Sequence, residues 1–172
     1  PAGVINIIAG NTREIGAELT SNPIVRKLTF TGSTEVGKLL VRQCADTMKR
    51  TSMELGGNAP FIVFDDADVD EAVKGALICK FRNAGQTCVC ANRMLVQEGI
   101  YDEFAEKLAA AMAALKLGDG SEDGVDVGPL INEKAANDVL EFVGDAVAQG
   151  AQVAAGGQRS DLGGCFIEPT LL

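Results

Sequence analysis

Residues 27–45 read K-L-T-F-T-G-S-T-E-V-G-K-L-L-V-R-Q-C-A. The run from Lys27 to Thr31 predicts a strand, Gly32 opens a turn that continues to Gly37, and the apolar residues after Lys38 recur at helical spacing up to Ala45. Parallel strands need a crossover, usually a helix, so strand, glycine turn and helix in succession are typical of a parallel sheet. We therefore expect an α/β fold.

The segments on either side continue this alternation. Upstream, Val4 to Ile8 is rich in β-branched residues and predicts a strand, and Thr12 can cap a short helix that ends at Asn22-Pro23, because proline pushes the preceding residue out of the helical region. Downstream, Thr51 to Leu55 predicts the next strand. A double glycine, Gly56-Gly57, then lets the chain turn sharply.

A second strand and helix follow the double glycine. Pro60 to Phe64 predicts a strand, Asp65 to Asp68 an acidic helix start that suits the helix dipole better than a metal site, and Val69 to Phe81 an amphipathic helix. Later segments predict, in order, a strand at Met94–Gln97, helices at Tyr101–Leu115 and Glu133–Gln149, a short strand at Gln152–Ala155 and a strand-like end at Cys165–Leu172.

Composition excludes several classes of function. The chain has 172 residues, a net charge of −9 and no histidine, and an acidic protein is a poor ligand for nucleic acid. Five irregularly spaced cysteines argue against a disulfide framework, and a single C-x-C pair without histidine argues against a structural zinc site. No apolar run approaches membrane-span length and no leader is visible, so we expect no metal, no membrane and a cytoplasmic protein.

The stretch that contains the candidate reactive cysteine is F-R-N-A-G-Q-T-C-V-C-A-N, residues 81–92. Cys88 follows the flexible, polar run Gly85-Gln86-Thr87, which favours a nucleophile over a buried thiol. Because the chain contains no histidine, its proton acceptor must be a carboxylate, a lysine or water, and Glu54 is the leading candidate. An ordinary strand-end carboxylate is the alternative for Glu54.

Three further positions have a functional and a structural interpretation. Gly32-Ser33 opens a helix, where free N–H groups suit a phosphate, although glycine turns with a serine cap are also common for structural reasons alone. Arg82 offers a planar fork for a carboxylate, or is a solvated arginine at a helix end. Cys90 is a candidate partner of Cys88 in an oxidation-sensitive switch, or a small packing residue.

Three motifs in this order resemble those of the aldehyde dehydrogenase superfamily: F-T-G-S-T-E-V-G at 30–37, M-E-L-G-G-N-A-P at 53–60 and G-Q-T-C at 85–88. With Gly128-Pro129-Leu130 and Glu168-Pro169-Thr170, the set is most similar to the succinate-semialdehyde dehydrogenase branch. The resemblance implies a Rossmann-like cofactor-binding part at residues 1–56, followed by part of the α/β catalytic domain at 57–172. It also implies that the chain is a central segment of a longer homo-oligomeric enzyme, a dimer or a tetramer.

The same resemblance assigns roles to residues. Cys88 is then the nucleophile, Glu54 the general base and Arg82 the group that holds a carboxylate on the substrate; Gly32, Ser33, Val36 and Leu55 belong to the NAD or NADP site. The expected reaction is oxidation of an aldehyde, succinate semialdehyde in this branch, through a Cys88 thiohemiacetal and a thioester that Glu54-activated water hydrolyses. We expect the isolated chain to be inactive, because it lacks groups that position the reactants.

Two other activities compete with this one. In a CoA-acylating aldehyde dehydrogenase a thiol takes the acyl group, and a water-activating base such as Glu54 argues against that reaction. A thiol-redox or metal-binding module would rest on Cys88 and Cys90, but their C-x-C spacing differs from the C-x-x-C of thioredoxin-like motifs.

Overall fold

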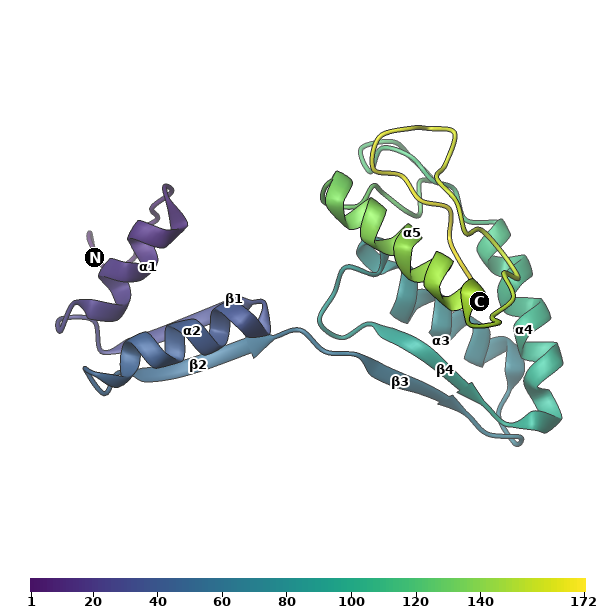
Figure 1. Cartoon of the computed structure of the whole chain (residues 1–172), viewed down its shortest axis with the longest axis horizontal. Coiled ribbons are helices and arrows are strands. Elements are labelled where there is room, and N and C mark those ends of the chain that lie inside the picture. Colours follow the sequence, from purple (N-terminus) through teal and green to yellow (C-terminus); the bar gives the residue numbers. More distant parts are fainter. The chain divides into compact units, whose positions relative to one another are not determined.

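The computed structural model describes all 172 residues, and the chain divides into two compact units, Pro1–Gly56 and Gly57–Leu172. The division falls at the double glycine. Each unit contains two parallel strands joined through a helix, and Figure 1 labels the elements of both. The expected α/β class is thus present in each unit.

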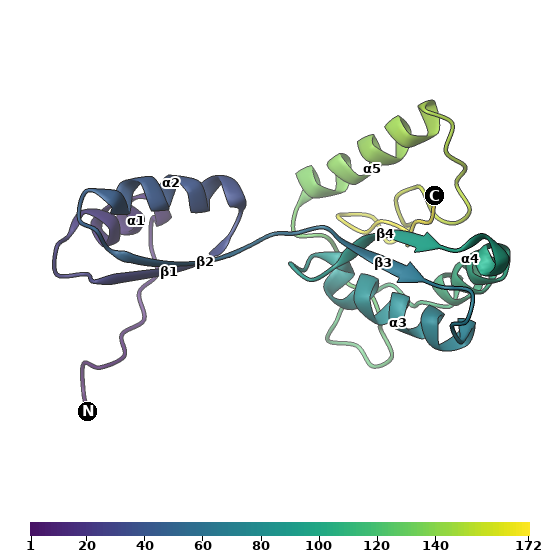
Figure 2. The ribbon, with the colours of Figure 1, turned by 90° about the horizontal axis from the view of Figure 1, so that it is seen from below.

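The first unit is built from α1 (Thr12–Ser21), β1 (Lys27–Gly32), α2 (Thr34–Ala45) and β2 (Arg50–Leu55). Strands β1 and β2 pair in parallel, and α2 is their crossover and runs along the pair in Figure 2. The helix begins four residues before the expected Lys38, because the side chain of Ser33 caps it by accepting from Val36 N–H at 3.2 Å. Residues 34–37 are therefore its first turn rather than a loop.

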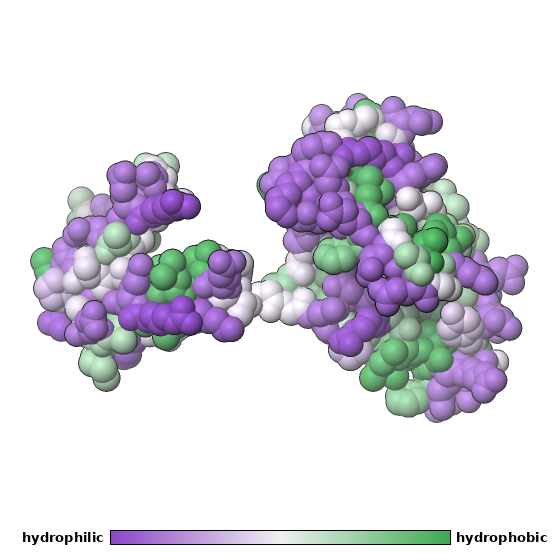
Figure 3. All heavy atoms as spheres, viewed as in Figure 1, coloured by the Kyte–Doolittle hydropathy of each residue, from purple (hydrophilic) through white to green (hydrophobic).

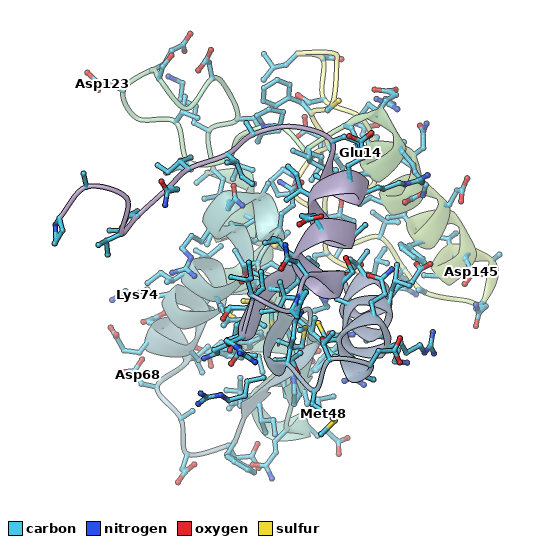
Figure 4. The ribbon with its side chains drawn as sticks, turned by 90° about the vertical axis from the view of Figure 1, so that its left-hand side faces the viewer. Glu14, Met48, Asp68, Lys74, Asp123 and Asp145 are labelled. Atoms are coloured by element: carbon cyan, nitrogen blue, oxygen red, sulfur yellow. The ribbon has the colours of Figure 1, made fainter.

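The second unit contains β3 (Ala59–Val63), α3 (Val69–Phe81), the short 3₁₀ segment η1 (Arg82–Gly85), β4 (Ala91–Val96), α4 (Glu98–Ala113) and α5 (Glu133–Ala148). Strands β3 and β4 are parallel. Helix α3 begins and ends where the sequence predicts. Asp68, labelled in Figure 4, caps it by accepting from Glu71 N–H at 3.1 Å, so the acidic run does act at the helix start.

The core of the second unit lies between the strands and helices α3 and α4. Its buried side chains are Val63, Val73, Ala76, Phe104, Leu108 and Met112. At the solvent-facing side of the helices, Lys107 of α4 donates to Asp70 of α3 at 2.7 Å, which lowers the pKa of Asp70. This exposed pair contributes little to stability, so apolar packing holds the helices together.

Strand residues that alternate with the core residues are exposed. Ile62 and Leu95 are register partners, and more than half of each remains accessible. Figure 3 shows apolar surface over β3 and β4 on this side. The parallel pair is thus covered on one face by α3 and α4 and leaves apolar side chains uncovered on the other.

Three expected strands are wrong, and the first expected cap is displaced by one residue. Val4–Ile8 forms no strand and is exposed, since the only partner of β1 is β2 and nothing pairs with this segment. Gln152–Ala155 and Cys165–Leu172 meet only through the isolated bridge between Ala155 and Leu171, because Gly156 and Gly157 adopt positive φ and Pro169 lacks an N–H. Asn11, not Thr12, caps α1 through Arg13 N–H.

Replacing Phe104 by alanine should lower the free energy of unfolding of the second unit by about 3–5 kcal/mol, because a fully buried ring would leave a cavity in the core. Tyr101→Ala, at a half-exposed position of the same helix, should cost about 1 kcal/mol or less. Urea denaturation of the 172-residue chain measures both. Equal losses would show that Phe104 does not pack as described.

Candidate active site

The loop that carries Cys88 is the connection between α3 and β4. The chain leaves α3 at Phe81, passes through η1 and enters a turn in which Cys90 N–H donates to Thr87 O at 3.3 Å. Because β4 must lie parallel to β3, this crossover delivers Cys88 just ahead of the amino end of β4. The strand pairing therefore decides where the thiol lies.

The backbone of η1 is left-handed over three residues. Asn83 and Ala84 both have φ of 54°, and Gly85 has φ of 75°. A left-handed conformation costs a non-glycine residue about 1–2 kcal/mol. Hydrogen bonds offset this cost: Gln86 N–H donates to Asn83 O at 3.1 Å, and Asn83 Nδ2 donates to Gln86 O at 3.2 Å.

Cys88 and Cys90 occupy different environments. Cys88 is exposed, whereas Cys90 is only 2% exposed, and both are free thiols. The Cys90 thiol lies 3.4 Å from Ala91 O and 3.7 Å from Asn92 Oδ1, inside the second unit. This burial favours the packing role for Cys90 over the switch with Cys88.

Gly57, the second residue of the double glycine, lies close to the cysteine loop, the segment 82–90 between α3 and β4. A Cβ placed on Gly57 would lie 3.4 Å from the carbonyl oxygen of Cys88, and Arg93 Nη2 donates to the neighbouring Asn58 O at 3.3 Å. The absence of a side chain at Gly57 lets the strand entry pass close to the loop. Gly57 of the second motif thus lies beside Cys88 of the third.

The candidate residues of the first unit gather at the carboxyl ends of β1 and β2. Thr31 and Gly32 are the register partners of Glu54 and Leu55, and Ser33 follows directly as the cap of α2. Ser33, Val36 and Glu54 are exposed. Leu55 instead packs on α2, where a Cβ on Gly37 would come within 2.7 Å of its Cδ2 atom. Leu55 therefore also has a packing role.

Arg82 is the first residue of η1 and is exposed. It lines a hollow of about 290 Å³ together with Leu77, Ile78, Phe81, Leu115 and Asp126. Cys88 is not among these lining residues. The hollow is shallow and open, and its lining combines apolar side chains with the guanidinium of Arg82 and the carboxylate of Asp126.

Two residues beside Cys88 were not identified as site residues from sequence. Gln86 forms side-chain hydrogen bonds to a segment more than forty residues away, and Thr87 Oγ1 is buried without a hydrogen-bond partner. Their position in the G-Q-T-C motif was the only sequence signal for these two residues, because hydrogen bonds between distant segments leave no local pattern in the sequence. A buried hydroxyl without a partner is costly and is unusual outside functional regions.

Neither a metal centre nor a transmembrane helix is built from these elements. No group of three or more His, Cys, Asp or Glu side chains is arranged to hold a metal ion. None of the helices combines the length and the apolar character needed to cross a membrane.

Comparison with known proteins identifies the family. The family model described as "Aldehyde dehydrogenase family" matches residues 1–172, and the chain belongs to this family. It is 63% identical to a 3-sulfolactaldehyde dehydrogenase of Pseudomonas putida and 60% identical to the succinate-semialdehyde dehydrogenase [NADP(+)] of Escherichia coli. Both matches cover 100% of this chain but only 35% and 36% of the relatives, so the chain spans about a third of their length.

A solved structure agrees with the fold. The crystal structure of an NADP-dependent enzyme of Escherichia coli matches with a TM-score of 0.96 and 61% identity, over 99% of this chain and 35% of the other. The α/β fold described above is therefore part of the aldehyde dehydrogenase fold.

Replacing Gly85 by alanine should destabilise the second unit by about 1–3 kcal/mol, because alanine would be forced to a left-handed conformation. Its Cβ would also meet Lys80 O at 2.9 Å. Gly120→Ala is the matched control, since nothing lies within 4 Å of the added Cβ and φ is not positive there. Thermal unfolding of both variants is the measurement, and a Gly85→Ala variant as stable as Gly120→Ala would contradict this geometry.

Proposed function

We propose that the full-length enzyme, meaning the family-length protein that carries this chain, oxidises an aldehyde to its acid with NAD or NADP, with Cys88 as the nucleophile. The observation that carries the proposal is the exposed thiol of Cys88 on a hydrogen-bonded loop, within a chain that matches the aldehyde dehydrogenase family along its whole length. An exposed cysteine in a fixed turn is accessible to a substrate carbonyl.

The first unit offers groups suited to the cofactor. Ser33 and Val36 are exposed at the amino end of α2, a twelve-residue helix, where the helix dipole favours a phosphate, and Gly32 leads directly into that turn. Gly32 also has a packing reason, because a Cβ there would collide with the Phe30 ring at 2.4 Å. These residues fit a dinucleotide phosphate, and the bound cofactor would supply the hydride acceptor.

The chain's own groups account for the remaining chemistry. The Cys88 thiolate adds to the aldehyde carbon, and the backbone N–H of Cys88 is suited to donate to the oxyanion that forms. Loss of hydride from this thiohemiacetal leaves a thioester on Cys88. Water then attacks the thioester carbon as Glu54 takes its proton; the carbon–sulfur bond breaks, and the acid and the Cys88 thiolate are released.

Connectivity supports Glu54 as the base. Glu54 precedes Gly57 by three residues, and three residues span at most about 11 Å. Gly57 in turn passes close to the Cys88 carbonyl. Three residues of chain thus connect the exposed carboxylate at the end of β2 to Gly57.

The substrate is proposed to carry an anion at the end away from the aldehyde. Arg82 supplies a guanidinium beside an apolar hollow on the segment that leads to Cys88. Asp126 lines the same hollow, but its Oδ2 accepts from Lys116 N–H at 2.9 Å, so one of its oxygens is already engaged. The names of both relatives above denote dehydrogenases of short anionic aldehydes, a carboxylate in one and a sulfonate in the other. Succinate semialdehyde is the substrate we favour.

The test is to incubate the full-length enzyme with succinate semialdehyde and each cofactor, quench in acid and search by mass spectrometry for an acyl group on Cys88. We expect reduced cofactor and a succinyl thioester, and neither in Cys88→Ser. Turnover that requires coenzyme A would favour the CoA-acylating reaction instead. Reduced cofactor with an unmodified Cys88 and an active Cys88→Ser variant would disprove the proposed nucleophile.

Replacing Glu54 by glutamine in the full-length enzyme should preserve the first hydride transfer and slow acid release about 100-fold or more, because the thioester then lacks its base. Stopped-flow absorbance should show a burst of reduced cofactor followed by a slow phase. Glu106→Gln, at an exposed carboxylate of α4, is the control. A lost burst in Glu54→Gln would mean that Glu54 also activates Cys88.

Replacing Arg82 by leucine should lower kcat/KM for succinate semialdehyde about 10- to 100-fold, the loss of one charge-assisted contact of about 1.5–3 kcal/mol. An uncharged aldehyde of the same length should be affected much less, and Arg82→Lys should fall between, since it keeps the charge but loses the planar fork. Steady-state kinetics with both aldehydes is the measurement. Equal losses for the two substrates would show that Arg82 supports the loop and does not read the anion.

A further inference from the structure

The side chain of Gln86 links the cysteine loop to a distant segment. Its Oε1 accepts from Ile131 N–H at 2.8 Å, and its Nε2 donates to Asn83 O at 3.1 Å and approaches Pro129 O at 3.5 Å. The amide therefore uses both its acceptor and its donor. Gln86 stands two residues before Cys88, and Ile131 stands immediately before Asn132, the residue that caps α5.

The segment that Gln86 contacts is itself anchored. Leu130 N–H donates to Cys165 O at 3.0 Å, and Asn132 Oδ1 accepts from Ala135 N–H at 2.9 Å at the start of α5. Arg159 joins the same region by donating to Glu133 Oε1 at 2.5 Å and Gly164 O at 2.8 Å. Residues 129–131 thus offer a fixed surface against which the loop can be held.

The loop needs such an anchor. Asn83 and Ala84 are left-handed, which disfavours this conformation in an isolated chain by about 1–2 kcal/mol for each residue. The hydrogen bonds between Asn83 and Gln86 are local and would fix only the shape of the turn. The bonds from Gln86 tie the turn to residues 129–131, while Cys79 of α3 holds the other end of the loop through Val89 O and Ala91 N–H.

We propose that Gln86 is a positioning residue that holds the cysteine loop against the start of α5 and so places the Cys88 thiol for attack. The effect on catalysis rests on the proposed role of Cys88 as nucleophile, whereas the hold on the loop does not. Gln86 acts through backbone groups of Asn83, Pro129 and Ile131. A nucleophile displaced by about 1 Å can lose about 100-fold in rate, so a modest shift of the loop is sufficient.

Gln86→Met in the full-length enzyme tests the proposal, because methionine keeps the length of the side chain and removes both hydrogen-bonding groups. Gln97→Met is the matched control. Gln97 Oε1 also accepts a distant backbone N–H, that of Asp65 at 2.6 Å, but it follows the far end of β4, about 20 Å along the strand from the loop. Both variants lose a comparable side-chain to backbone hydrogen bond.

Two measurements distinguish an effect on the stability of the loop from an effect on the rate of the reaction. Amide hydrogen exchange should become faster in peptides covering residues 82–91 and 128–132 of Gln86→Met, and should be unchanged there in Gln97→Met. Stopped-flow kinetics should show a burst of reduced cofactor slowed about 10- to 100-fold in Gln86→Met, with KM changed less than about threefold. Gln97→Met should keep the burst of the unmodified enzyme.

Each result supports or overturns the proposal. Unchanged exchange in Gln86→Met would show that Gln86 does not hold the loop, and faster exchange with an unchanged burst would show that the hold does not position Cys88. Equal slowing in both variants would indicate general destabilisation, which also overturns it. If the unmodified enzyme reduces no cofactor with any aldehyde, the proposed function fails, and hydrogen exchange still decides whether Gln86 holds the loop.

Discussion

The parallel pairing of β3 with β4 is the constraint on which the second unit depends. Parallel neighbours cannot be joined by a tight turn, so the chain must leave β3, travel back along a helix and re-enter at the same end of the sheet. The helix that does this, α3, also supplies two of the six buried core residues, Val73 and Ala76. The loop at the end of α3 is thereby forced to the amino end of β4, and this is where the sequence places Cys88. The connection between β3 and β4 thus contributes to the core and also carries Cys88.

In the cysteine loop, the cost of the left-handed backbone and the stabilisation from hydrogen bonds are similar in size. Two left-handed non-glycine residues cost about 2–4 kcal/mol together, and the hydrogen bonds that join Asn83, Gln86 and residues 129–131 return about 1 kcal/mol each. These contributions are similar in size, so the turn persists only while most of its bonds are made. A strained turn held in this way is well defined in shape, which suits a nucleophile, and is sensitive to the loss of any one partner.

Sequence predicts the local features of this chain well and its long-range features poorly. Val69–Phe81 is predicted with the observed limits, because an acidic cap and an apolar periodicity are both local signals. Val4–Ile8 is a false strand, because β-branched residues indicate a preference that only a hydrogen-bonding neighbour can satisfy. The positive φ of Asn83 and Ala84 was not predicted from the sequence. The hydrogen bonds of Gln86 to residues near 130 were not predicted either. The sequence identified Cys88 and Glu54 as candidates, and the structure adds that Cys90 is buried, which favours its packing role.

Cys88 and Glu54 are both exposed to solvent, which bears on the roles proposed for them as nucleophile and base. A carboxylate is an effective base near neutral pH when it is desolvated, yet Glu54 is exposed at the end of β2, and Cys88 is exposed in its turn. The water around them must be displaced before the groups reach the low-dielectric surroundings in which electrostatic catalysis is strong. The chain spans about a third of the length of its relatives, and the proposed reaction is that of the family-length protein. The geometry of the loop around Cys88 is thus fixed within this chain, whereas the roles proposed for Cys88 and Glu54 require surroundings that exclude water.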